Sequence, residues 1–154
     1  MEQFELQFGD YVISADKSRF DLAAIHEYLS KQTYWAMDRS FDTVEKSIRH
    51  SLCFGVFASD GKQVGFARIV TDYATFAWLC DVFILEEYRK KDLGKRLIET
   101  VVAHPDLIRI QRIMLATRDA HELYRCYGGF TALKNPEKWM ERLVTNHAKP
   151  PGAA

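Results

Sequence analysis

The chain has 154 residues, of which 47% are hydrophobic, and its 21 basic side chains balance its 21 acidic ones. This length suits one domain whose core folds without disulfides, and the even charge balance gives no reason to expect nucleic acid or an anionic membrane as a partner. Cysteines and histidines show no metal-ligand spacing. The sequence therefore predicts a protein without a metal. It also lacks an apolar leader and any run of about 18 apolar residues, so it predicts a soluble cytoplasmic protein.

The predicted elements begin with a strand at about 10–14 and two amphipathic helices. The segments 18–31 and 40–52 each repeat apolar side chains at helical spacing, with Ser18 and Asp42 as their capping candidates. The apolar faces contain Leu22, Ile25 and Leu29 in the first helix, and Val44, Ile48 and Leu52 in the second. Both helices are therefore expected to pack one face against a sheet.

The middle of the chain predicts three antiparallel strands. Residues 53–70 contain two strand-like runs, and the Asp-Gly pair at 60–61 joins them as a hairpin because both residues tolerate positive φ. A second turn at 72–75 leads into the strand at 76–85. The aromatic segment 32–39, "QTYWAMDR", has no clear period and is predicted to be a loop over a site.

The remaining elements alternate between helix and strand. They are a helix from Leu93 that ends before Pro105, a strand at 112–117, a short helix at 120–127 with Asp119 as its cap, a strand at 130–134, and a helical stretch near 136–144. This order predicts an α/β fold with one mixed, mostly antiparallel sheet flanked by helices. We expect a single domain over residues 1–145 and a disordered tail at 146–154.

A basic turn lies between the third antiparallel strand and the following helix, in "EEYRKKDLGKRLIET", residues 86–100. A strand that ends in a tight basic turn and opens a helix offers an anion several backbone N–H groups, the helix dipole and nearby cations. Pyrophosphate is the natural ligand for such a turn. The alternative is that the cations form a solvated face and that Gly94 is only a tolerated helix glycine.

The strand order, "VFILEEYRKKDLGKRLIE" and the later "LYRCYGGF" resemble the GNAT superfamily of acyl-CoA N-acyltransferases, whose turn reads R/Q-x-x-G-x-G/A. The resemblance spans roughly residues 10–135. It implies that the strand pairs with the pantetheine arm of acetyl-CoA and that the turn binds the pyrophosphate. The implied contacts are Val82, Phe83 and Ile84 for the arm, and Arg89, Lys90, Lys91, Asp92, Leu93, Gly94 and Lys95 for the pyrophosphate.

Asp92 stands where the family pattern has its first glycine. Its carboxylate repels a diphosphate, and its Cβ disfavours a positive φ. Aspartate tolerates left-handed geometry better than most residues, so the side chain could point to solvent. Alternatively, it caps the helix and occupies the amides that a phosphate would use.

Two side chains are candidates for the chemistry. Transfer of an acyl group to an amine requires a proton for the departing thiolate, and the resemblance implies that Tyr124 supplies it. The alternative for Tyr124 is packing against the sheet. Asp81 interrupts the apolar run "FAWLCDVFIL" and is either a base or amine anchor, or a structural hydrogen-bond acceptor.

Five aromatic residues suggest an acceptor pocket. Tyr34, Trp35 and Trp78, together with Phe41 and Tyr73, either line a pocket for a hydrophobic or cationic amine or belong to the core. The sequence predicts an N-acetyltransferase that moves acetyl from acetyl-CoA to a small-molecule or peptide primary amine by direct attack, as a monomer or homodimer. The alternative is a weakly active or inactive GNAT-fold module that senses CoA or contacts a protein.

Overall fold

Six strands form one sheet in the computed structural model, which describes residues 3–144. They are β1 (Glu5–Phe8), β2 (Tyr11–Ser14), β3 (Leu52–Phe57), β4 (Gln63–Thr71), β5 (Phe76–Ile84) and β6 (Arg112–Met114), and they neighbour one another in this order. Every pair is antiparallel except β5 with β6, which is parallel. The α/β class and the mostly antiparallel sheet are thereby confirmed.

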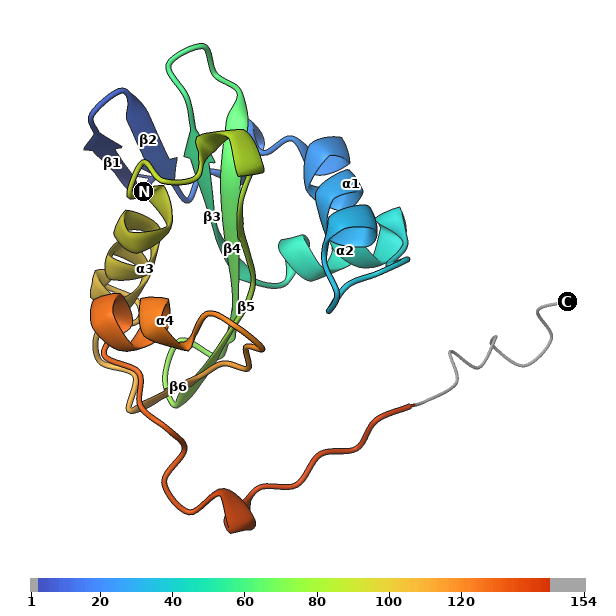
Figure 1. Cartoon of the computed structure of the whole chain (residues 1–154), viewed down its shortest axis with the longest axis vertical. Helices are drawn as coiled ribbons and strands as arrows, with labels where there is room; N and C mark the ends of the chain where they lie inside the picture. The colour runs from blue at the N-terminus through green and yellow to red at the C-terminus, as the bar shows by residue number, and fades with distance from the viewer. Residues whose placement is uncertain (1–2, 145–154) are drawn as a thin grey trace, which may run out of the picture.

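Helices cover both faces of this sheet. They are α1 (Leu22–Gln32), α2 (Phe41–Arg49), α3 (Leu93–Ala103) and α4 (His121–Gly128), with short 3-10 turns at Lys17–Arg19, Glu86–Tyr88 and Pro136–Lys138. Figure 1 shows α1 and α2 on one side of the sheet and α3 and α4 on the other. One buried cluster lies under α1 and α2, and a second contains the apolar faces of α3 and α4.

The helix faces are confirmed except at Leu52, which begins β3 instead of belonging to α2, and the predicted caps are wrong. Ile25 and Leu29 of α1 are buried as the period requires. The caps are Asp21, which accepts from the amide of Ala24, and Ser40, which accepts from Thr43. In each case the capping oxygen binds the amide three residues on. As a result, α1 begins four residues after the start of its predicted segment, and α2 begins one residue after the start of its own.

The C-terminal part differs most from the expected elements. No strand forms at 130–134, and of the helical stretch at 136–144 only the 3-10 turn Pro136–Lys138 is present. Gly129 adopts a left-handed φ of 70° that ends α4, and the chain then leaves the body of the fold (Figure 1). Conversely, β1 was not predicted, and α4 begins without a side-chain cap from Asp119. The tail at 146–154 lies outside the described residues.

The free edge of β5 positions the site. Pairing with β6 ends at Trp78 and Met114, while β5 continues to Ile84. On its other side, the β4–β5 register shifts between Phe66 and Arg68. Asp81 has a φ of 51° at this irregularity, which is the geometry of a β-bulge. Because β5 and β6 separate beyond Trp78, a cleft opens between the end of β5 and the chain that follows β6.

Candidate active site

A cleft of about 1360 Å³ lies where β5 and β6 separate. Its wall includes the end of α1, the loop after it, β5, the basic turn, residues 116–120 and α4. The residues that were expected at the site and that line the cleft are Tyr34, Trp35, Trp78, Asp81, Val82, Phe83, Ile84, Arg89, Lys90, Asp92, Leu93, Gly94, Lys95 and Tyr124. Lys91, Phe41 and Tyr73 were also considered, and they do not line it.

The N-terminus of α3 forms one end of this cleft. The first backbone bond of the helix runs from the amide of Arg96 to the carbonyl of Asp92, 3.0 Å apart. The amides of Leu93, Gly94 and Lys95 precede this bond and have no carbonyl partner within the helix, and no side chain caps them. Lys90 and Asp92 are both left-handed, with φ of 64° and 62°. This arrangement turns several N–H groups toward one concave space, which suits a phosphate group.

Asp92 adopts the first of its two expected alternatives. Its side chain is 67% exposed and makes no capping hydrogen bond. Instead, one carboxylate oxygen lies 3.1 Å from Nζ of Lys95. The amides at the start of α3 are therefore left to a ligand, and the negative charge at the turn is partly balanced by the next basic residue.

Arg89 holds the turn in place from inside. Its Nε donates to the carbonyl of Ile84 at 3.1 Å, and its Nη2 donates to the hydroxyl of Tyr28 at 2.8 Å. The ring of Tyr28 stacks on Phe83 with centroids 4.1 Å apart. The side chain of Arg89 therefore connects the basic turn to β5 and α1. Lys90 and Lys95 are the other basic residues of the turn that line the cleft.

The free edge of β5 provides the second part of a cofactor site. Beyond Trp78, the N–H and C=O groups on the β6 side of β5 have no strand partner in residues 3–144. An extended ligand with amide groups can satisfy such an edge in the way an added strand does. The pantetheine arm of acetyl-CoA contains two amides in an extended chain, so Val82, Phe83 and Ile84 fit the role expected of them.

Tyr124 brings a protonated hydroxyl to the same cleft. The residue is 9% exposed, and its ring meets Phe130 edge-on with centroids 6.0 Å apart. Burial raises the pKa of the Tyr124 hydroxyl to about 12, with smaller contributions from Tyr34, Asp119 and Cys80. The group therefore keeps its proton at neutral pH and can donate it. Tyr127, in contrast, does not line the cleft.

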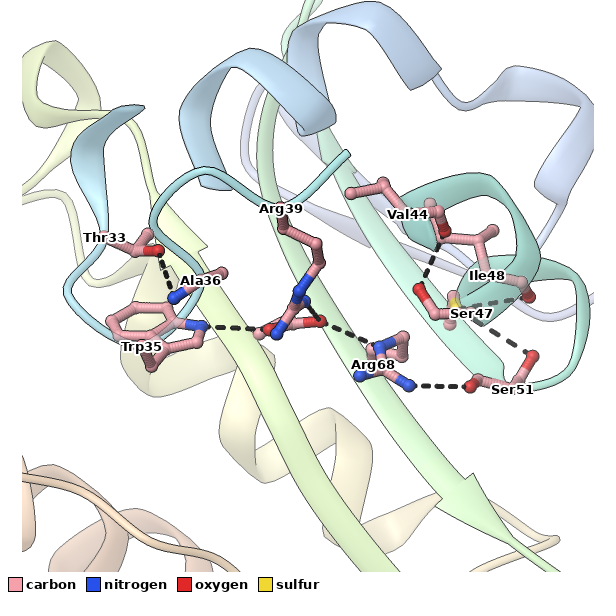
Figure 2. Close-up of polar contacts among 11 residues, drawn as sticks. Thr33, Trp35, Ala36, Arg39, Val44, Ser47, Ile48, Ser51 and Arg68 are labelled. Carbon is pink, nitrogen blue, oxygen red and sulfur yellow. Dashed lines mark hydrogen bonds and ion pairs between the residues drawn. The ribbon is translucent and has the colours of Figure 1, made fainter. Parts of the chain in front are cut away.

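Asp81 is the centre of a polar cluster at the other end of the cleft. One carboxylate oxygen accepts from Nε1 of Trp35 at 2.9 Å, and the other accepts from Nη1 of Arg39 at 2.9 Å and from Nε of Arg68 at 2.8 Å. Arg68 also donates to Oγ of Ser51 at 3.1 Å. Figure 2 shows Trp35, Arg39 and Arg68 converging on this point from the loop after α1 and from β4. With both oxygens engaged, the geometry favours the structural acceptor over the base.

Sequence reasoning did not single out Arg39, Arg68 or Arg118, although all three line the cleft. A signal was present for two of them. Arg68 interrupts the apolar run "VGFARIV", just as Asp81 interrupts its own strand, and Arg39 belongs to the aromatic loop that was expected to cover a site. A buried cation and a buried anion in adjacent strands are expected to pair.

The aromatic candidates divide into two groups. Tyr34 and Trp35 are both partly exposed at the cleft, and their rings meet edge-on with centroids 5.0 Å apart. Trp78 lines the cleft as well, whereas Phe41 and Tyr73 do not. Phe41 instead packs edge-on against His26 at 5.6 Å. The aromatic wall of the cleft therefore comes from the loop after α1 and from β5.

The chain is similar to known proteins over most of its length. The model of the acetyltransferase (GNAT) family matches residues 22–128. The chain belongs to the GNAT acetyltransferase family. As a GNAT enzyme it is an acyl-CoA-dependent N-acetyltransferase, and the GNAT fold binds acetyl-CoA.

Individual relatives of this GNAT chain cover most of its length. A candidate acetyltransferase of Gibberella zeae is 30% identical over 75% of this chain and 76% of its own. A crystal structure of a candidate GNAT acetyltransferase from Xanthomonas campestris pv. campestris is 48% identical, with a TM-score of 0.85 over 90% of this chain and 96% of that one. Spermidine N-acetyltransferase from Vibrio cholerae, in complex with CoA and spermine, is 19% identical and has a TM-score of 0.63 over 79% and 81% of the chains. The last likeness shows the fold alone.

The described residues contain neither a cluster placed for a metal ion nor a membrane-spanning helix. Within residues 3–144, no group of three or more His, Cys, Asp or Glu side chains is placed to hold a metal ion. None of the described helices combines the length and the apolar character needed to span a bilayer.

Proposed function

We propose that this enzyme acetylates a primary amine by direct attack of the amine on the thioester of acetyl-CoA, with Tyr124 as the general acid. One observation supports the proposal above all others: a single cleft joins the free amides of α3, the open edge of β5 and the buried hydroxyl of Tyr124. These are the parts needed for a diphosphate, for an extended amide chain and for a departing thiolate.

The residues that hold the co-substrate follow from this arrangement. The amides of Leu93, Gly94 and Lys95 are free at the diphosphate end, and Lys90 and Lys95 line the cleft there. The free edge of β5 faces the amide-bearing arm. Acetyl-CoA supplies the acetyl group as a thioester at the end of that arm.

The transfer forms one bond and breaks one bond. The nitrogen of a neutral amine bonds to the acetyl carbon, the carbon–sulfur bond breaks, and coenzyme A leaves as a thiol. Tyr124 donates its hydroxyl proton to the sulfur and regains a proton from solvent, while the amine nitrogen releases its extra proton to solvent. Because Asp81 is held by three donors, this scheme assigns it to positioning of the acceptor end.

A second candidate is a weakly active or inactive GNAT-fold module that senses CoA or contacts a protein. The observation that favours it is the carboxylate of Asp92, which stands at the turn in left-handed geometry. A negative charge at this position opposes a diphosphate. The pairing of Asp92 with Lys95 limits that repulsion, so we place the enzyme first.

Calorimetric titration with acetyl-CoA, followed by an amine panel with detection of free thiol, tests the proposal. We expect binding and amine-dependent thiol release. Binding without thiol release supports the sensing module, and absence of binding at millimolar acetyl-CoA contradicts both. The cytoplasmic location and the monomeric or homodimeric state stay predictions.

A further inference from the structure

The acceptor end of the cleft carries an excess of positive charge. Away from α3 and the basic turn, the charged side chains that line the cleft are Arg39, Arg68, Arg118, Asp81 and Asp119. Three cations therefore face two carboxylates. An acceptor that enters here meets a net positive wall.

Because Asp81 is more deeply buried than the arginines around it, a ligand meets a larger excess of positive charge than the number of charged side chains indicates. The side chain of Asp81 is 1% exposed, whereas those of Arg39 and Arg68 are 23% and 13% exposed. A guanidinium has five N–H donors. Arg39 donates one of them to Asp81 and makes no other side-chain hydrogen bond within residues 3–144. The groups that a ligand can reach are therefore guanidinium donors, while the carboxylate lies behind them.

These donors share one cleft with the proposed general acid, because Arg39, Arg68 and Tyr124 all line it. Within the sheet, Arg68 pairs with Cys80, the neighbour of Asp81 in β5, and Cys80 lines the same cleft. At the rim, the guanidinium of Arg118 lies 3.9 Å from the ring centroid of Tyr34 and makes no ion pair in the described chain. One small molecule can therefore reach both the guanidinium donors and the thioester.

We propose that the amine acceptor carries a carboxylate, which binds Arg39 and Arg68 while the amine faces the thioester beside Tyr124. The inference rests on the proposed function and narrows its substrate class. Arg39, Arg68 and Asp81 together carry one net positive charge, which a single carboxylate neutralises. Guanidinium groups also match a carboxylate geometrically. Polyamines find no reachable carboxylate at this inner end, so an amino acid or a related amino carboxylate is the expected acceptor.

A matched substrate panel tests the proposal on the unmodified enzyme. Each common α-amino acid and β-alanine is compared with its own C-terminal amide at equal concentration of neutral amine, with phosphoethanolamine and spermidine as further arms. We expect the best carboxylate acceptor to exceed its amide in kcat/KM by roughly 10- to 100-fold, the range for a hydrogen bond to a charged group. Equal or faster turnover of the amides, or a preference for phosphoethanolamine or spermidine, would overturn the inference.

Substitution of Arg39 tests whether this residue is responsible for the preference for a carboxylate acceptor. Arg39→Gln is expected to raise KM for the carboxylate acceptor by about 10-fold while leaving kcat within about 2-fold, and Arg39→Lys to recover part of the loss. The amide substrate is expected to be unaffected. Arg125→Gln, an exposed arginine of α4 that does not line the cleft, is the matched control. Equal losses for the carboxylate and the amide would assign Arg39 to folding and overturn its role in recognition.

Failure of the inference and failure of the proposed function give different results. If acetyl-CoA does not bind, or if no amine releases thiol, then the proposed function is wrong and the inference falls with it. If thiol is released but the carboxylate gives no advantage, only the inference is wrong. Because the substrate panel uses the wild-type enzyme, it decides this point even if Arg39→Gln fails to fold.

Discussion

The two ends of the cleft contain the same kinds of side chain and use them differently. At the basic turn, Asp92 is 67% exposed and lies 3.1 Å from Nζ of Lys95. At the acceptor end, Asp81 is 1% exposed and is bound by two guanidinium groups and an indole. An exposed carboxylate stays hydrated, so its ion pair contributes little to stability. A buried carboxylate loses its hydration and is tolerated only when it is paired. We therefore expect Asp92 to affect ligand binding more than stability, and Asp81 to affect stability more.

The largest effect is expected from breaking the buried cluster. Asp81→Asn removes the negative charge and leaves Arg39 and Arg68 without a counter-ion in a buried place. Loss of one partner of a buried pair costs about 3–5 kcal/mol, so we expect the free energy of unfolding to fall by about that amount in denaturant titrations. Asp92→Asn is the matched control, with an expected change below about 1 kcal/mol. Similar stability losses in the two variants would contradict the contrast between the two ends.

Tyr124→Phe is expected to reduce kcat by about 100-fold, at the lower end of the range for a general acid, because a thiolate leaves fairly well without a proton. Removing one hydroxyl while keeping the ring should leave the melting temperature and the affinity for CoA nearly unchanged. The measurement is kcat with one accepted amine, beside CoA titrations of both proteins. An unchanged kcat would assign Tyr124 to packing.

The pH profile provides a second readout of Tyr124. Burial raises its pKa to about 12, so the acid form persists to higher pH than in an ordinary tyrosine. With an acceptor that is already neutral, the wild-type kcat is expected to stay level up to about pH 10. Because the unfolded chain releases this proton at lower pH than the folded protein does, the free energy of unfolding is expected to fall as the pH rises from the unfolded to the folded pKa of Tyr124. A fall in kcat centred below pH 10 would contradict the role of this hydroxyl.

Asp92→Gly sharpens the description of the basic turn. Glycine restores a residue that adopts positive φ without strain and removes a charge that opposes the diphosphate. One exposed charge contributes about 1 kcal/mol at close range in water, so CoA affinity is expected to rise by about 5-fold. Calorimetric titration measures it. Weaker binding would show that the carboxylate organises the turn through Lys95.

The smallest effect is expected on CoA affinity when either of two neighbouring lysines is replaced. Lys90 lines the cleft and Lys91 does not. Lys90→Ala is therefore expected to weaken CoA binding by about 3- to 5-fold, and Lys91→Ala by less than about 2-fold at moderate salt, since an exposed charge that points away from the ligand is screened. Equal effects of the two substitutions would indicate that only the summed charge of the turn matters.

Much of the molecule was predictable from local patterns. The existence and approximate position of α1, α2, α3 and α4 and the hairpin at 60–61 depend on residues close together in sequence, and these elements were predicted correctly. The residues predicted for the cofactor end also depend on a local pattern, and most of them line the cleft. The capping residues and the elements after α4 were predicted wrongly, and β1 was not predicted. A cap depends on which amide its oxygen reaches, and a strand at 130–134 requires a partner edge that no local pattern reveals.

The acceptor end depended on tertiary structure. Trp35 and Asp81 are 46 residues apart, and Arg39 and Arg68 reach the same carboxylate from 42 and 13 residues away. The sequence by itself determined that a charged residue interrupts each of two apolar strands, and it left Asp81 open as a base or a structural acceptor. Only the register of β4 against β5, with its bulge at Asp81, and the path of the loop after α1 bring the donors to this carboxylate and thereby favour the structural acceptor. Burial of a charge is set by what packs around it, and most of those groups come from distant parts of the chain.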